Sequence, residues 1–401
     1  MIEIGEAKTG LLESINEIEE IESVNLYDCL GRVLAENIIA PYNNPPFNRS
    51  PLDGYAIKGE DTVNASFDNP VKMKVTGKIF AGQTYEGYLE NSQAVRIMTG
   101  AMIPEGANAV IRQEDTSYRN GHIEICKSIK PYDNFCYAGE DYKKGEILAQ
   151  SGTYIHAGVA AIIASAGLST VKVYKRPEVS VIATGDELME PGEKMQNGKI
   201  FDANLTYITS RLRELSIPVT YRAHVDDDAN KLADIIKKQT KHSDLIITTG
   251  GVSVGEKDII HEVVKILDGR LLFWKVKIKP GTPVLAFTVK KTLVICLSGN
   301  PFGSIANFEI LVRPVLAKLS RNTTADTKVV QAKIIGSFDK SSKYCRFVRG
   351  YYENNHVHIV NGNHSSGAVS SMAHTNCLIE IKPEMKGVRT GDTVNIYLLS
   401  F

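Results

Sequence analysis

Three glycine-rich turns between residues 183 and 304 each follow an apolar run that is typical of a buried strand. They read ATGDEL (183–188), TTGGVSVGEKD (248–258) and LSGNPFGS (297–304). Glycine lets the backbone approach a ligand closely, and the amides that open the next helix can bind an anion. Parallel strands would bring all three turns to the carboxyl edge of one sheet, where such sheets bind ligands. We therefore predict a site for a phosphorylated ligand at this edge.

Carboxylates and lysines lie beside these turns. Glu187 and Asp258 stand in two of them, and Mg²⁺ prefers carboxylate oxygens, so an anion bound together with Mg²⁺ fits the pattern. Lys275, Lys277 and Lys279 in WKVKIKPG would share one face of a strand. That face is either a solvated basic edge or an oxyanion contact. The KPG turn favours the second interpretation for Lys279.

Each motif also has a purely structural explanation. Any single turn can be a plain strand-to-helix loop with an aspartate as helix cap. It is the combination of three turns with the KPGTP loop that favours a binding site. Asp53 in SPLDGYA and Thr99 in RIMTGAMIP lie in irregular loops, where periodicity alone assigns them no role. The nine histidines and six cysteines show no metal-binding spacing, so no zinc site is expected.

The spacing of the elements predicts the architecture. From residue 178 to 320, strands alternate with helices, which indicates a doubly wound parallel sheet with helices on both faces and a last helix from Phe302 to Leu319. Residues 6–36 are expected to form one or two helices, and Tyr154 to Gly167 a further one. Residues 55–139 and 327–401 contain short alternating runs broken by turns, as in small β modules, the latter a barrel or sandwich.

Bulk composition excludes several classes of protein. A chain of 401 residues should fold as several domains. Lys+Arg and Asp+Glu are both 46, so no basic excess indicates a nucleic-acid binder. The sequence contains no apolar run long enough to span a membrane, and its acidic N-terminus lacks the features of a secretory signal. We therefore expect a cytoplasmic enzyme with reduced cysteines.

The motifs, in this order, resemble those of the molybdopterin molybdenumtransferase family. The matching segments are PPFNRSPLDGYA, MTGAMIPEGANAVI, GEDYKKGEIL, ATGDEL, TTGGVSVGEKD, KIKPGTP, SGNPFGS and GDTVNIYLL. The resemblance implies insertion of molybdenum from molybdate into adenylylated molybdopterin, with Mg²⁺-dependent hydrolysis of the adenylate and release of AMP. It implies a homodimer whose active site lies between subunits. The molybdopterin adenylyltransferase and apo-molybdoenzymes are possible further partners.

The resemblance also implies four domains and a set of functional residues. The domains are a discontinuous helical domain (1–45 with 140–172), an inserted β domain (46–139), a molybdopterin-binding α/β domain (173–320) and a C-terminal β-barrel-like domain (321–401). Catalytic roles fall on Asp53, Thr99, Glu187, Asp258, Lys275 and Lys279. Mg²⁺ is expected at Glu187, Asp258 and either Asp227 or Asp228. The pterin substrate is expected at Thr184, Gly185, Gly250, Gly251, Ser253, Gly255, Pro280, Gly281, Gly299, Asn300 and Pro301.

The sequence departs from the family pattern at three positions. Leu52 replaces a methionine, which is a conservative apolar exchange. Thr282 replaces the second lysine of KPGKP, and Ser298 replaces the proline of LPGNP, which removes a rigid turn residue. The last two exchanges could change which oxyanion is accepted. The alternatives left open are therefore a tungsten-inserting paralogue, a catalytically reduced molybdopterin-binding scaffold and a nucleotide-binding regulator.

Overall fold

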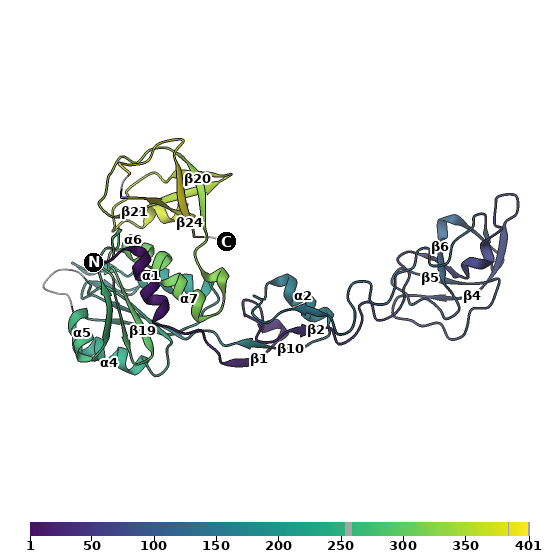
Figure 1. Ribbon diagram of the computed structural model, residues 1–401, viewed down its shortest axis with the longest axis horizontal. Coiled ribbons are helices and arrows are strands. Elements are labelled where there is room, and N and C mark those ends of the chain that lie inside the picture. The colour runs from purple at the N-terminus through teal and green to yellow at the C-terminus, as the bar shows by residue number, and fades with distance from the viewer. Residues whose placement is uncertain (253–258, 384, 400–401) are drawn as a thin grey trace. The chain divides into compact units, whose positions relative to one another are not determined.

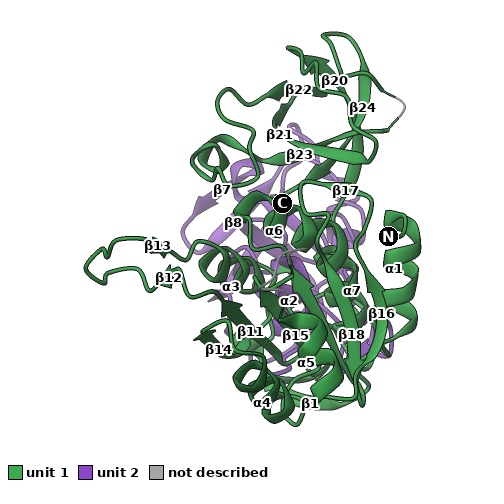
Figure 2. Ribbon diagram, turned by 90° about the vertical axis from the view of Figure 1, so that its left-hand side faces the viewer, with its two compact units in different colours: residues 1–36, 152–156, 170–401 green, residues 37–151, 157–169 purple. Residues whose placement is uncertain are grey.

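The computed structural model describes residues 1–252, 259–383 and 385–399. It divides into two compact units (Figure 2). Unit 1 comprises residues 1–36, 152–156 and 170–401, and unit 2 comprises residues 37–151 and 157–169. Across the described ranges, no helix combines the length and the apolar character that a membrane span requires. Each unit has hydrophobic cores of its own.

Unit 1 is built around a sheet with the strand order β14-β11-β15-β19-β18-β16. The first four strands run parallel, whereas β18 and β16 are each antiparallel to the neighbour before them in this order. β11, β15, β18 and β19 are buried at every residue, as expected for strands covered on both faces. The strands span Val179–Thr184 (β11), Val219–Val225 (β14), Leu245–Thr249 (β15), Arg270–Trp274 (β16), Leu285–Val289 (β18) and Thr292–Leu297 (β19).

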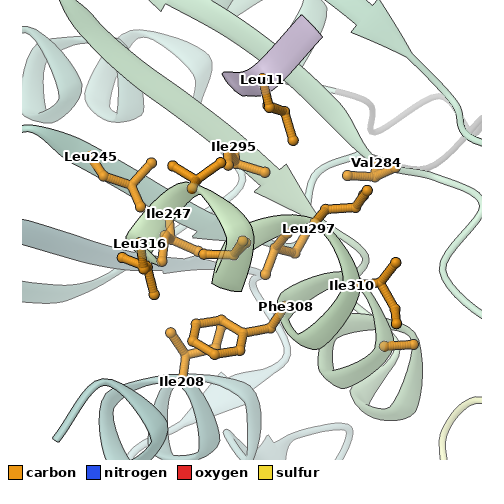
Figure 3. Close-up of a cluster of buried hydrophobic side chains, with 14 of the residues drawn as sticks. Leu11, Ile208, Leu245, Ile247, Val284, Ile295, Leu297, Phe308, Ile310 and Leu316 are labelled. Carbon is orange, nitrogen blue, oxygen red and sulfur yellow. The ribbon is translucent and has the colours of Figure 1, made fainter. Parts of the chain in front are cut away.

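Helices cover both faces of this sheet, which confirms the predicted doubly wound α/β fold. The sheet is mixed, however, and not parallel throughout as predicted, because β18 runs against its neighbours. One face packs against the first core, where Figure 3 shows Ile208, Phe308 and Leu316. The other face packs against a second core. The first core takes side chains from α1 (Ile4–Glu13), α3 (Asn204–Glu214), α6 (Pro301–Asn307) and α7 (Arg313–Leu319), and the second from α4 (Ala229–Gln239) and α5 (Ile260–Ile266).

The predicted helix from Phe302 to Leu319 is interrupted. Between α6 and α7 the backbone forms a π-helical turn over Phe308–Val312. Such a turn inserts one residue into the helical repeat and so changes which faces the following side chains occupy. Every residue of Phe308–Val312 is buried, Glu309 among them.

The predicted helix over residues 6–36 is wrong beyond Glu13. β1 (Ile21–Asn25) instead pairs antiparallel along its whole length with β10 (Thr170–Tyr174) (Figure 1). The partner strand lies about 150 residues away, so local periodicity gave no sign of it, and tertiary pairing overrides the weak helical pattern.

The predicted strand through WKVKIKPG is also wrong. β16 ends at Trp274, and Lys275 has a left-handed backbone with φ 65°. β17 (Ile278–Lys279) then pairs parallel with β21 (Cys345–Glu353), in the C-terminal segment, rather than with the α/β sheet. Lys275, Lys277 and Lys279 therefore do not share one face of a strand.

Unit 2 contains the small β module predicted for residues 55–139. Its main sheet has the order β6-β3-β5-β4-β8-β7. Tyr55 and Ala56 are neighbours in β3, so their side chains point to opposite faces of the sheet. Each belongs to a different apolar cluster, one on each face. A short pair, β2 with β9, and helix α2 complete the unit. The elements are β2 (Ile38–Ile39), β3 (Gly54–Ile57), β4 (Val71–Ile79), β5 (Gln93–Ile97), β6 (Ala109–Arg112), β7 (Thr116–Arg119), β8 (His122–Ile125), β9 (Ile147–Ala149) and α2 (Ala157–Ser165).

The C-terminal strands of unit 1 close into a barrel. The order β21-β22-β20-β24-β23 is completed by pairing of β23 with β21, and the interior is a separate apolar cluster. This closure confirms the barrel predicted for this segment and removes free sheet edges among these strands. The strands are β20 (Val329–Ile335), β21 (Cys345–Glu353), β22 (His356–Ile359), β23 (Cys377–Ile381) and β24 (Thr393–Leu398).

Candidate functional site

The three glycine-rich turns meet at the carboxyl edge of the α/β sheet, as predicted. The Gly250 amide donates a hydrogen bond to the Leu297 carbonyl at 3.3 Å, which joins the turns after β15 and β19. A Cβ atom on Gly250 would lie 2.1 Å from the Thr184 carbonyl oxygen, and one on Gly299 would lie 3.4 Å from the Gly250 Cα. Gly250 also has φ 89°, so both space and backbone conformation require glycine there.

The turns after β11 and β14 are joined in a similar way. Gly185 donates its amide to the Val225 carbonyl at 3.2 Å, and the Asp227 amide donates to Asp186 Oδ1 at 3.0 Å. The Glu187 carboxylate folds back over Gly185, where a Cβ would come within 2.6 Å of Oε2. Exposed acidic side chains are thereby gathered beside the glycine turns.

The described carboxylates do not by themselves make a Mg²⁺ site. Asp228 is the N-cap of α4, and its Oδ1 accepts hydrogen bonds from the amides of Asn230 and Lys231. Within the residues that the structure describes, no group of three or more His, Cys, Asp or Glu side chains is arranged to hold a metal. Asp258, the central residue of the predicted metal set, lies outside the described residues, as do Ser253 and Gly255. The Mg²⁺ ligands stay a prediction.

Two buried hydroxyls lie at the ends of neighbouring parallel strands. Thr184 ends β11, Thr248 lies in β15, and they are 2% and 0% exposed. In the described part of the chain neither Oγ1 atom has a hydrogen-bond partner. The Thr184 hydroxyl lies within 3.1 Å of the position that a Cβ on Gly251 would occupy. Since buried polar groups are normally satisfied, this hydroxyl is suited to bind a polar ligand at the turn.

A cleft of about 760 Å³ within unit 1 borders the turn after β19. One wall is the loop Lys279–Pro283 with Ser298 and Asn300, and the other comes from the barrel. The barrel residues are Ser341, Ser342, Lys343, Tyr344, Ser366 and Pro383. The cleft therefore includes four predicted site residues, namely Lys279, Pro280, Gly281 and Asn300. The two lysines that line it, Lys279 and Lys343, suit an anion.

The other two lysines of the run are engaged elsewhere. The Lys277 ammonium forms an ion pair with Glu3 at 2.5 Å. Lys275 places its ammonium 4.0 Å from the centroid of the Trp274 ring. Of this run, Lys279 lines the cleft and the other two lysines do not, and the catalytic role of Lys275 stays a prediction.

A buried arginine ties the barrel to α6. Arg349 is 0% exposed, and its guanidinium lies 3.6 Å from the centroid of the Phe302 ring and donates to the carbonyls of Asn363, Ser365 and Ala368. Burial lowers the pKa of Arg349 to about 10. The Phe302 amide donates to the Ser366 carbonyl at 2.8 Å. These contacts fix the barrel wall of the cleft against the start of α6, next to Pro301.

In unit 2, Asp53 and Thr99 are brought together. Asp53 Oδ1 accepts hydrogen bonds from the Thr99 amide and the Thr99 hydroxyl, both at 2.8 Å. These two bonds hold the pKa of the exposed Asp53 carboxyl below its ordinary value, the backbone bond contributing most. The pair is thus an ionised carboxylate with a fixed orientation, although 46 residues separate its members in the sequence.

Sequence reasoning missed two buried polar residues of the helical segment behind the cleft. Asn307 and Glu309 are both 0% exposed and lie next to or within the π-helical turn. The signal was a pair of polar residues in an otherwise apolar helix, NFEILV. A buried polar side chain in such a place needs hydrogen-bond partners, and both residues have them.

The chain is similar in sequence to known proteins along most of its length. Three family models match: the MoeA N-terminal region (domain I and II) over residues 2–167, a probable molybdopterin binding domain over 180–318, and the MoeA C-terminal region (domain IV) over 331–399. A molybdopterin molybdenumtransferase of Staphylococcus epidermidis is 35% identical over 400 residues, covering 99% of this chain and 95% of the relative. One from Staphylococcus aureus is 34% identical over 379 residues, covering 94% and 90%.

A solved structure shares the whole fold. The crystal structure of a molybdopterin biosynthesis MoeA protein from Pyrococcus horikoshii matches with a TM-score of 0.85 and 30% identity, covering 100% of both chains. The likeness therefore extends over the α/β sheet, the β module and the barrel together.

Proposed function

This chain belongs to the molybdopterin molybdenumtransferase family, and we propose that it inserts molybdenum from molybdate into adenylylated molybdopterin, with hydrolysis of the adenylate and release of AMP. It is accordingly a transferase of molybdenum cofactor biosynthesis. The observation that carries the finer proposal is the meeting of three glycine-rich turns, the last of which borders a cleft lined by Lys279. A phosphorylated ligand and a tetrahedral oxyanion need these two features side by side.

The residues divide the work by their chemistry. The backbone amide of Gly251, together with the Thr184 hydroxyl, which has no hydrogen-bond partner among the described residues, is suited to the phosphate of the pterin substrate. Lys279 in the cleft is suited to neutralise molybdate. Asp53, oriented by Thr99, keeps its proposed catalytic role as a carboxylate of fixed orientation. Glu187, Lys275 and Asp258 keep their proposed catalytic roles, and the remaining turn residues Gly185, Gly299, Asn300, Pro280, Gly281 and Pro301 keep their proposed binding roles.

Mg²⁺, the assembly state and the location of the enzyme belong to the same proposal. Family membership supports Mg²⁺ dependence, but the described carboxylates alone do not form its site, so we assign it no step. Family membership also supports a cytoplasmic homodimer, the four-domain division given above, and the adenylyltransferase and apo-molybdoenzymes as partners. A dimer would allow the Asp53–Thr99 pair of one subunit to serve the α/β site of the other.

The test uses the purified full-length protein with adenylylated molybdopterin, molybdate and Mg²⁺, and measures AMP release and molybdenum in the product. Lys279→Met should raise the KM for molybdate about tenfold or more, because a charge-assisted contact is lost. Lys277→Met is the matched control. Lys277 lies two residues from Lys279 and its ammonium pairs with Glu3, so the KM for molybdate of this variant should equal that of the native protein.

Three other outcomes of this assay would change the proposed function. Pterin binding without AMP release would identify a scaffold and contradict the proposed activity. Faster reaction with tungstate than with molybdate would identify a tungsten-inserting enzyme. Equal effects of the two lysine substitutions would remove Lys279 from the oxyanion site.

A further inference from the structure

Asn307 is a fully buried amide at the end of α6 that hydrogen-bonds to both loops on the α/β side of the cleft. Its Nδ2 donates to the Gly281 carbonyl at 2.9 Å. Its Oδ1 accepts the Ser298 amide at a long 3.4 Å. Gly281 belongs to the Lys279–Pro283 loop and Ser298 to the turn after β19, so one side chain joins the two loops to each other and to the helix.

The three segments are closely packed against one another. Gly281 has φ 97°, and a Cβ there would lie 2.6 Å from Asn307 Nδ2 and 2.8 Å from the Gly303 carbonyl oxygen. A Cβ on Gly303 would in turn lie 2.9 Å from Ser298 Oγ. Atoms at van der Waals contact transmit a displacement directly. A shift of Asn307 would therefore move the loop that carries Lys279.

Ser298 needs Asn307 for a reason specific to this sequence. The family pattern has proline at this position, which has no amide hydrogen and a fixed φ. Ser298 has an amide hydrogen and is 3% exposed, so that amide needs an acceptor, and Asn307 Oδ1 is that acceptor. The Ser298 hydroxyl also accepts the Asn300 amide at 3.3 Å. Hydrogen bonds thus take over the rigidity that the proline ring supplies elsewhere.

We infer that Asn307 is a positioning residue for the oxyanion cleft and that it acts as a coupled pair with Ser298. It holds the Lys279 loop and the turn after β19 at a fixed separation, and through them it sets the affinity for molybdate. The link to molybdate rests on the proposed function. The link to loop order does not.

The experiment compares Asn307→Ala, Ser298→Pro and the double variant with the native protein. Hydrogen–deuterium exchange is measured for peptides covering residues 279–283 and 298–301, and KM and kcat are measured with molybdate. Asn307→Ala should speed exchange in both peptides and raise KM about tenfold, with kcat changed less than about twofold, because its loss leaves two buried groups unpaired. In the Ser298→Pro background the same substitution should have a severalfold smaller effect, because one of its two bonds is already absent.

The matched control is Asn322→Ala. Asn322 is also buried, at 5% exposure, and also makes two hydrogen bonds, both to Thr324, but it does not line the cleft. It should lower the melting temperature without changing exchange in the two cleft peptides or the KM. If Asn307→Ala does not fold, Ser298→Pro alone still tests the pair: the proline ring should replace the rigidity that the Ser298–Asn307 bond supplies, so exchange at residues 299–301 should stay as slow as in the native protein, and faster exchange there would overturn the coupling.

The outcomes separate the two proposals. Unchanged exchange in a folded Asn307→Ala protein would overturn the positioning role, as would a KM change equal to that of Asn322→Ala. Additive effects in the double variant would overturn the coupling to Ser298. Faster exchange in a protein whose native form transfers no molybdenum would leave the positioning role standing and reject the proposed function.

Discussion

Glu309 offers the sharpest test of how unit 1 is held together. Its carboxylate is 0% exposed and lies in the π-helical turn. Oε1 accepts hydrogen bonds from Tyr207 and from Arg211 Nε, both at 2.8 Å, and Oε2 accepts from Arg313 at 3.0 Å. Arg313 also donates to the carbonyls of Ala325 and Asp326, in the segment that leads to the barrel. One carboxylate therefore connects α3, α7 and that segment.

Glu309→Gln keeps the shape of the side chain and removes the charge. It leaves the Arg211 and Arg313 side chains, 8% and 1% exposed, without their shared counter-ion. Burial lowers the pKa of Arg211, but the Glu309 carboxylate outweighs that effect and raises it overall, which shows how strongly the charges interact. Removing one partner of a buried ion pair costs about 3–5 kcal/mol, and we expect a loss of that size in the free energy of unfolding.

The assay is guanidinium chloride unfolding followed by tryptophan fluorescence. Trp274, the single tryptophan, lies in β16 and so reports on the α/β sheet alone. Glu214→Gln is the control, because Glu214 contacts the same Arg211 but is 58% exposed and should contribute only about 0.3–0.5 kcal/mol. A Glu309→Gln loss below about 1 kcal/mol, or one equal to that of the control, would refute the reasoning.

Three further predictions concern the site. Thr99→Val should raise the pKa of Asp53 part of the way toward its ordinary value, because the hydroxyl bond is lost and the stronger backbone bond remains; a carboxyl NMR titration measures it. Gly250→Ala should destabilise unit 1 by more than about 3 kcal/mol, because its Cβ would meet the Thr184 carbonyl at 2.1 Å; tryptophan-detected unfolding measures it. Thr282→Lys should tighten molybdate binding, because Thr282 lines the cleft and the new ammonium adds a positive charge; calorimetric titration measures it.

Each of these has its own control. Thr99→Ser keeps the hydroxyl and should leave the Asp53 pKa low, and a shift as large as that of the valine variant would contradict the assignment. Gly198→Ala also has positive φ, 76°, but open space around it, so a loss matching that of Gly250→Ala would show that backbone strain alone decides. Thr282→Val removes the hydroxyl that donates to the Ile278 carbonyl at 2.5 Å without adding charge. If it tightens binding as much as lysine does, charge is not the cause.

The sequence by itself determined the parts of the fold that depend on local pattern. Continuous apolar runs such as LIITT identified strands buried on both faces, and short alternating runs identified the β module and the barrel. Glycine at positions such as Gly250 identified turns that no other residue could form. These features follow from periodicity and backbone conformation, which a single segment carries within itself.

Tertiary structure decided everything that depends on a partner distant in the chain. β1 is a strand because β10 pairs with it, and β18 runs antiparallel to β19 because a two-residue connection, Lys290 and Lys291, returns the chain along the sheet. Lys279 entered the cleft and Lys277 did not, because the chain leaves one sheet at Lys275 and joins another at Ile278. The roles of Asn307 and Glu309 depend on hydrogen bonds to groups up to 102 residues away. The sequence could predict the turns of the site, but only packing decides which side chains hold them in place.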